Sequence, residues 1–155
     1  MPLKSLAIGL FMCAVAVSGL YAANVSFLVM ETGVPRDGAS SRYSIMWENG
    51  LLEVFFESGH IVSNAPRMSL TDTVISEGFP SEAARDHADA RNGGMDYFLI
   101  AIIEHPSRDV SLRLFTTTSQ KMIAERAYPG SSTRTVREEN ENIRTAVREM
   151  AAFVR

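Results

Sequence analysis

Residues 96–104 read DYFLIAIIE, and this stretch decides the fold. Residues 97–103 are all apolar, with no polar residue between them. A strand with one face in water alternates apolar and polar residues, whereas a strand that is covered on both faces is apolar throughout. The sequence therefore predicts a central strand at 96–104.

Strand and helix patterns alternate along the chain before this central strand. The predicted elements are a strand at 25–30, a helix from Ser40 or Ser41 to about Ser58, a strand at 61–62 that Pro66 stops, and a helix at 81–92. Gly59 is expected to end the first helix, because glycine adopts the left-handed conformation of a helix C-cap at little cost. Residues 70–79 are predicted to form a loop. This alternation predicts parallel strands joined by right-handed crossovers.

After the central strand, the pattern changes to a hairpin followed by a helix. Residues 110–117 alternate between apolar and polar side chains, and residues 121–128 are expected to return beside them. The last helix is predicted over about 135–153, because apolar residues recur there at three- and four-residue steps. The expected order is β-α-β-α-β-β-β-α. It gives a mixed α/β fold with a single mixed sheet of about five strands and helices packed on it.

The amino terminus has the three parts of an export signal. Lys4 supplies a positive charge, residues 6–20 form an apolar run, and small residues follow at 22–23. The alternative is a membrane anchor, but a spanning helix needs roughly 20 apolar residues and this run is shorter. We therefore expect residues 1–22 to be a secretory signal peptide, and residues 23–155 to be one domain that is periplasmic or otherwise exported. No further long apolar stretch predicts an integral membrane span after signal removal.

The mature chain is expected to lack cysteine chemistry and a nucleic-acid partner. Cys13 is the only cysteine and leaves with the signal peptide, so neither a disulfide nor a cysteine metal site is then possible. Removing Lys4 leaves 14 basic and 18 acidic residues, a net charge of −4. A mildly acidic chain without a basic cluster argues against nucleic acid as the main partner.

Three segments resemble a family of bacterial envelope domains. They are the helix-to-strand junction at 56–62 (FESGHIV), the entry into the central strand at 93–100 (GGMDYFLI), and the hairpin of 112–115 (LRLF) and 121–125 (KMIAE). These segments and the terminal helix are similar to the amino-terminal domain of TolB, to CsgG, and to the LpoB-like lipoprotein activators of penicillin-binding proteins. The resemblance implies the same fold and a non-enzymatic adaptor that binds other envelope proteins. It implies no catalytic residue, because the family offers none to match.

No catalytic, metal or cofactor site is predicted from local motifs. His60 begins one strand, His87 lies in mid-helix and His105 follows the central strand, so the three cannot meet at one metal ion. The chain has no G-x-S-x-G nucleophile elbow. The glycines at 93–94 precede a strand and are not followed by lysine, so they do not form a phosphate loop. We expect no metal and no cofactor.

One alternative site remains at the carboxyl ends of the parallel strands, where open α/β sheets bind ligands. The polar residues expected there are Glu31, Asn64, Glu104 and His105, with Arg36 and Asp37 on the first loop. A carboxylate beside a histidine can exchange protons with a substrate. The alternative function is therefore that of a small-ligand-binding or hydrolytic domain.

The first helix carries two apolar stripes. On a helical wheel, its broad core face consists of Tyr43, Trp47, Leu51, Val54 and Phe55. A second stripe, on nearly the opposite side, consists of Ile45, Leu52 and Phe56. Either the last helix packs on this second stripe, or the stripe binds an envelope protein or a second copy of the chain. The export signal, the absent catalytic set and this stripe together predict an exported, non-enzymatic accessory or adaptor protein.

Overall fold

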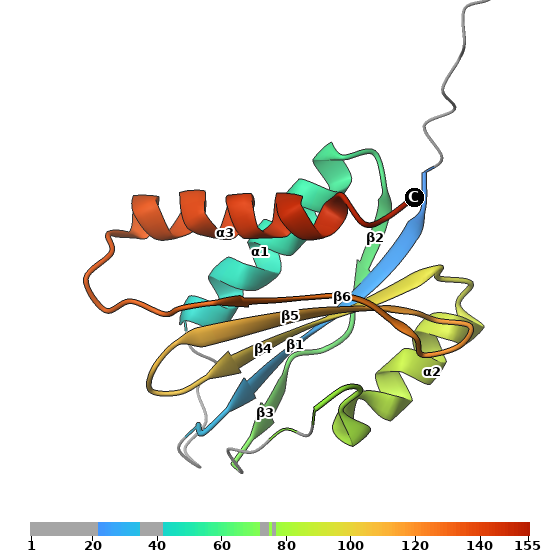
Figure 1. The fold of residues 1–155 in the computed structure, drawn as a ribbon, viewed down its shortest axis with the longest axis horizontal. Helices are drawn as coiled ribbons and strands as arrows, with labels where there is room; N and C mark the ends of the chain where they lie inside the picture. Colours follow the sequence, from blue (N-terminus) through green and yellow to red (C-terminus); the bar gives the residue numbers. More distant parts are fainter. Residues whose placement is uncertain (1–21, 35–41, 72–74, 76) are drawn as a thin grey trace, which may run out of the picture.

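The computed structural model describes residues 22–34, 42–71, 75 and 77–155. In it, the predicted central strand lies in the middle of a single mixed sheet (Figure 1). The sheet has six strands. They are β1 (Asn24–Thr32), β2 (Ile61–Asn64), β3 (Met68–Leu70), β4 (Tyr97–Glu104), β5 (Asp109–Thr116) and β6 (Met122–Tyr128). Their order across the sheet is β2-β1-β4-β5-β6, and β3 lies beside β1.

β4 lies between a parallel neighbour, β1, and an antiparallel neighbour, β5. Its residues 98–103 are all buried, which confirms the expected cover on both faces. β5 and β6 form the antiparallel hairpin that the sequence predicts. The mixed α/β fold class is therefore confirmed, with parallel pairing in the first half of the chain and antiparallel pairing in the second.

Helices cover both faces of the sheet (Figure 1). α1 (Arg42–Glu57) and α3 (Val136–Ala151) lie side by side on one face, and α2 (Ala84–Asn92) lies on the other, after a 3₁₀ turn at Ser81–Ala83. Successive side chains of a strand point to opposite faces. Phe27 of β1 accordingly packs in the apolar cluster under α1 and α3, whereas Leu28 packs in the cluster that includes α2.

β2 and β3 form one edge strand that is interrupted at residues 65–67. β2 pairs with the first half of β1 and β3 pairs with its end, both in parallel register. Pro66 lies in the interruption, and proline has no N–H with which to continue the hydrogen-bond ladder. The sequence predicts the stop at Pro66 but not the short strand that resumes at Met68. The sheet therefore has one strand more than expected.

The end of α1 is fixed by the glycine that the sequence predicts. Gly59 has a φ of +85°, the left-handed conformation that favours glycine. Its N–H donates to the Phe56 carbonyl at 2.9 Å, and the next N–H, of His60, donates to the Phe55 carbonyl at 3.1 Å. These two bonds make a Schellman motif. The predicted cap at Ser40 or Ser41 lies outside the described residues.

The predicted signal peptide at 1–22 lies, except for its last residue, outside the described residues. In the part of the chain that is described, no helix combines the length and the apolar character needed to cross a membrane.

Candidate partner-binding surface

α1 buries one face against the sheet and α3. The residues predicted for this core face are all buried: Tyr43, Trp47, Leu51, Val54 and Phe55. They pack in one apolar cluster with β1, β4, β5 and the apolar stripe of α3. The predicted core face of α1 is therefore confirmed.

The second stripe of α1 lies on the side away from this core face. Phe56 exposes 76% of its surface and Ile45 exposes 40%. Leu52, between them in the sequence, is half-buried at the margin of the apolar cluster. We call these three residues the outer stripe. Fully burying an aliphatic or aromatic side chain is favourable by about 1.5–3 kcal/mol. Binding of a partner that covers the outer stripe would therefore be favoured by the burial of these side chains.

α3 packs beside the outer stripe rather than on it. Where Gly50 of α1 faces α3, an added Cβ would lie 2.3 Å from Cγ2 of Ile143. Farther along the pair, Arg144 donates to the Glu53 carboxylate at 2.6 Å and to the Glu57 carboxylate at 2.8 Å. These contacts occupy a different sector of α1, and they leave the outer stripe uncovered by the last helix.

A groove of about 520 Å³ runs between α1 and α3, next to the outer stripe. Ile45 and Met46 contribute apolar lining from α1, and Val136 and Ile143 contribute it from α3. Val136 exposes 51% of its surface there. Ile45 therefore belongs both to the outer stripe and to this space, which we call the α1–α3 groove.

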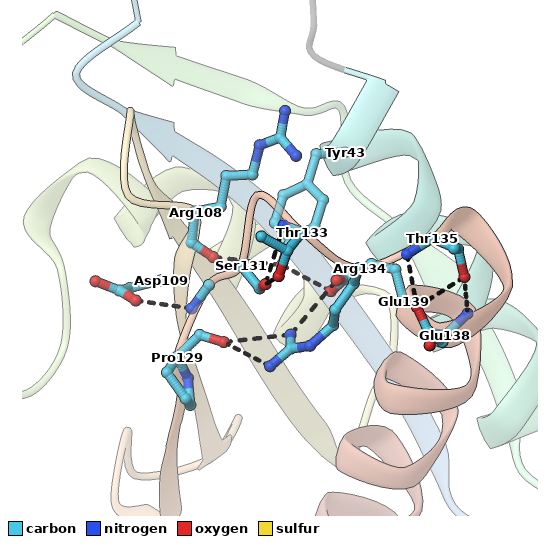
Figure 2. A network of polar contacts seen from close by, with 11 residues as sticks. Tyr43, Arg108, Asp109, Pro129, Ser131, Thr133, Arg134, Thr135, Glu138 and Glu139 are labelled. Atoms are coloured by element: carbon cyan, nitrogen blue, oxygen red, sulfur yellow. Dashed lines mark hydrogen bonds and ion pairs between the residues drawn. The ribbon is translucent and has the colours of Figure 1, made fainter.

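Near the first turns of α1 and α3, the groove reaches a network of polar contacts around Glu139, which is only 6% exposed (Figure 2). The Tyr43 hydroxyl donates to Glu139 Oε1 at 3.0 Å, and Arg134 Nη1 donates to Glu139 Oε2 at 3.4 Å. Burial raises the pKa of Tyr43 to about 12, so its phenol stays neutral and can donate at neutral pH. The guanidinium of Arg108 lies over the Tyr43 ring, 5.6 Å from its centroid. The network joins α1, α3 and the β4–β5 turn.

The segment between β6 and α3 is held at both of its ends (Figure 2). At one end, the Gly130 N–H donates to Asp109 Oδ1 at 2.8 Å, and this bond lowers the pKa of Asp109. At the other end, Thr135 and Glu138 form a capping box: each side chain accepts the backbone N–H of the other residue, at 3.3 Å and 2.7 Å. The bond from the Thr135 N–H lowers the pKa of Glu138, and so does the Thr135 hydroxyl, which donates to the same carboxylate at 2.8 Å. These bonds fix the position of the segment that forms one side of the network.

The structure brings together two of the residues predicted for the alternative ligand site. Glu31 is fully buried near the end of β1, and its Oε1 lies 3.2 Å from Nε2 of His105, which follows β4. The two residues meet because β1 and β4 are parallel neighbours whose carboxyl ends lie at the same edge. A buried carboxylate therefore lies next to a histidine at the carboxyl ends of β1 and β4, as expected from the sequence.

Of the other predicted members of that site, Asn64 lies apart from this pair. Asn64 is level with Phe27, in the middle of β1, because β2 pairs only with the first half of β1. Its side-chain amide donates to Glu48 of α1 at 2.7 Å. Glu104 is exposed to solvent. Arg36 and Asp37 lie outside the described residues.

The three histidines occupy separate environments. His60 lies against the Phe55 ring, and burial lowers its pKa. His87 is buried and packs edge-on against Phe98. Among the described residues, no group of three or more His, Cys, Asp or Glu side chains is placed to hold a metal ion.

The network around Glu139 is not predicted by any local pattern in the sequence. Tyr43, Arg108 and Arg134 come from distant parts of the chain, and only the folded topology shows that they meet. One part of it was visible in the sequence. A threonine followed three residues later by glutamate, as in Thr135 and Glu138, is the signature of a helix start.

Comparison with known proteins gives matches among solved structures alone: no protein-family model and no curated protein matches the sequence. A single-substitution variant of the PelC dodecamer from Paraburkholderia phytofirmans matches with 14% identity over 84% of this chain and 89% of that chain, at a TM-score of 0.53. Lipoprotein GNA1162 from Neisseria meningitidis matches with 14% identity over 84% of this chain and 99% of that chain, at a TM-score of 0.51. The LpoB C-terminal domain from Escherichia coli matches with 12% identity over 76% and 90% of the two chains, at a TM-score of 0.47.

At identities this low, structural likeness establishes the fold alone. PelC and GNA1162 are matched over most of both chains, so the likeness extends over most of this chain. The chain therefore shares its fold with PelC and with the lipoprotein GNA1162, and the resemblance to bacterial envelope domains is confirmed at the level of the fold.

Proposed function

We propose that the protein is an exported, non-enzymatic accessory protein of the bacterial envelope that binds another envelope protein through the outer stripe of α1. In this proposal, residues 1–22 are a signal peptide that is removed on export. Residues 23–155 then form a single domain in the periplasm, with no membrane span of its own.

The observation that carries the proposal is the exposure of Phe56 and Ile45 on the helix face opposite the core. A few large side chains, aromatic ones prominent among them, carry most of the binding free energy near the centres of protein–protein interfaces. The helix is rigid, since its other face is buried and its end is fixed by Gly59. A rigid face loses little conformational entropy when a partner binds.

The shared fold supports the compartment and the type of role. GNA1162 is a lipoprotein, and PelC is a dodecamer, so this fold occurs both in a lipid-anchored protein and in an assembly of many copies. The apolar start of the chain supports export. A second copy of the chain is therefore the alternative occupant of the outer stripe.

Crosslinked capture from the native envelope fraction tests the proposal. The baits are the wild-type protein, an Ile45→Ser/Phe56→Ser variant, and a matched control, Met122→Ser/Ile123→Ser. The control residues on β6 are also apolar and exposed, but they lie away from α1. We expect the wild type and the control to capture the same envelope protein and the stripe variant to lose it.

Three outcomes would contradict the proposal. Capture of the same protein by the stripe variant would show that the outer stripe is not the binding face, and a stripe variant that unfolds in thermal denaturation would show that the stripe belongs to the core. If the bait is crosslinked only to itself, the partner is a second copy of the chain and not another envelope protein.

A second candidate function is that of a small-ligand-binding or hydrolytic site at Glu31 and His105. The observation that favours it is their contact at 3.2 Å, in which the carboxylate can orient the imidazole for proton transfer. Ligand screening by thermal shift, with His105→Ala as the comparison, tests this candidate. A ligand that stabilises the wild type and His105→Ala equally rules the pair out as its site.

A further inference from the structure

A separate feature of the molecule is a pair of exposed arginines at one end of the α1–α3 groove. The protein as a whole is acidic, with a formal net charge of −3. Arg42 and Arg108 are nevertheless both exposed beside a pocket of about 140 Å³ between α1, the β4–β5 turn and the start of α3. Within the described part of the chain, neither arginine forms an ion pair.

The carboxylate in this pocket does not neutralise the two arginines. Glu139 also lines it, but one of its oxygens accepts from Tyr43 and the other pairs with Arg134. Glu139 and Arg134 therefore balance each other, and among the described residues that line the pocket no further carboxylate offsets the charges of Arg42 and Arg108. Two guanidinium groups at a partly enclosed site favour a carboxylate, to which each can donate paired hydrogen bonds.

This basic pocket is continuous with the α1–α3 groove. Arg42, Met46 and Val136 line both spaces. Beyond them, Ile45 and Val136, from opposite walls, are exposed by 40% and 51%. An extended chain that placed an acidic group at the arginines could therefore bury an apolar side chain between these two residues.

The remaining polar lining of the groove consists of an ion pair and two carboxamides. Glu53 and Arg144 pair with each other at 2.6 Å, and the side chains of Asn49 of α1 and Asn140 of α3 suit a peptide backbone. A carboxamide side chain both donates and accepts hydrogen bonds, which matches the alternating N–H and C=O groups of a peptide. A lipid chain offers no hydrogen-bonding group to either amide.

We infer that the α1–α3 groove binds an acidic, apolar peptide segment of the partner protein. Its carboxylates contact Arg42 and Arg108, and an aliphatic or aromatic side chain lies between Ile45 and Val136. This inference rests on the proposed function, because it assigns a chemistry to the partner that the outer stripe binds. It also extends the contact surface from α1 to α3 and the β4–β5 turn.

Selection from a random short-peptide library displayed on phage, with the purified exported protein as the target, tests the inference. We expect enriched peptides that combine Asp or Glu with an aliphatic or aromatic residue. Their affinity should fall about tenfold in an Arg42→Glu/Arg108→Glu variant, as expected when two exposed ion pairs are lost and reversed. It should also fall as the salt concentration rises.

The matched control is Arg85→Glu/Arg91→Glu, which makes the same change in charge at two exposed arginines of α2, on the opposite face of the sheet. This variant should bind the selected peptides as the wild type does. A Val136→Ser variant, also at an exposed position, should weaken binding without changing its salt dependence.

Three results would overturn the inference: no enriched peptide, enriched peptides without acidic residues, or equal binding by the Arg42/Arg108 and Arg85/Arg91 variants. Self-association that the Arg42→Glu/Arg108→Glu variant abolishes in sedimentation would replace the peptide by a second copy. Phe56→Ser separates this inference from the proposed function, because Phe56 does not line the groove. If the envelope partner is lost with Phe56→Ser but kept with Arg42→Glu/Arg108→Glu, the proposed function stands and the groove inference fails.

Discussion

Gly50 of α1 lies so close to Ile143 of α3 that a single added carbon on Gly50 would come within 2.3 Å of the Ile143 Cγ2 methyl. This contact sets the distance between the two helices, and it therefore sets the width of the α1–α3 groove. Arg144, which bonds to Glu53 and Glu57, fixes the same pair of helices farther along. The glycine in the middle of α1 is explained by this approach, because glycine is otherwise unfavourable inside a helix.

Replacing Gly50 by alanine is expected to lower the free energy of unfolding by about 1–3 kcal/mol, the usual cost of overpacking a core. Intrinsic helix propensity alone predicts the opposite, a gain of about 1 kcal/mol. Chemical denaturation measures the difference. The Ile143→Ala variant supplies the control, because in its background the Gly50→Ala change should no longer be destabilising. A stabilised Gly50→Ala single variant would show that the helices are not held at this distance.

Replacing Tyr43 by phenylalanine removes the hydroxyl that donates to buried Glu139. We expect a loss of about 1–3 kcal/mol in the free energy of unfolding, since a buried charged acceptor loses a partner. Tyr97→Phe is the control: the Tyr97 hydroxyl donates to the carbonyl of Arg155, at an exposed position. That change should cost less than about 0.5 kcal/mol. Equal losses in the two variants would show that the bond from Tyr43 to buried Glu139 stabilises the protein no more than the exposed bond of Tyr97.

Alkaline pH should destabilise the protein through Tyr43. Burial raises its pKa to about 12 in the folded state, against a usual value of 10.0. The folded state therefore favours the neutral phenol, and this contribution to stability is complete below pH 10 and is lost as the pH rises toward 12. Urea denaturation across this range should show a decline that is shallower in Tyr43→Phe. A decline of equal slope in both proteins would assign it to other groups.

The helix end at Gly59 gives a prediction about backbone conformation alone. Its φ is +85°, and no atom would lie within 4 Å of an added Cβ. Gly59→Ala should therefore cost about 1–2 kcal/mol from the left-handed conformation and nothing from packing. Gly59→Asn should cost less, because asparagine tolerates this conformation better. Thermal denaturation of the two variants should rank them in that order, and the reverse order would contradict this explanation of the cap.

Local patterns predicted most of the fold because most elements carry their own signal. The unbroken apolar run of β4 and the glycine after α1 each determine a structure within a few residues. β3 was missed because its three residues have no periodicity of their own and are ordered only by pairing with β1. β3 forms only because β1, which is distant in the sequence, lies beside it.

The candidate site was predictable to the extent that it lies on one helix. Ile45, Leu52 and Phe56 share a line on α1, and helical periodicity alone reveals that line. Asn64 and Glu31 both follow predicted strands, but the register of β2 against β1 places Asn64 level with Phe27 and away from Glu31. Arg42 and Arg108 could not be paired from the sequence, since nothing local relates the start of α1 to the β4–β5 turn.

The most direct test of the central claim compares Phe56→Ser with Ile123→Ser in binding to the envelope partner identified by crosslinking, using isothermal titration calorimetry. We expect both variants to keep the wild-type unfolding temperature, and Ile123→Ser to bind like the wild type. Phe56→Ser should bind at least about tenfold more weakly, as expected for an aromatic anchor. Wild-type affinity in Phe56→Ser would contradict the claim that the outer stripe of α1 is the binding face.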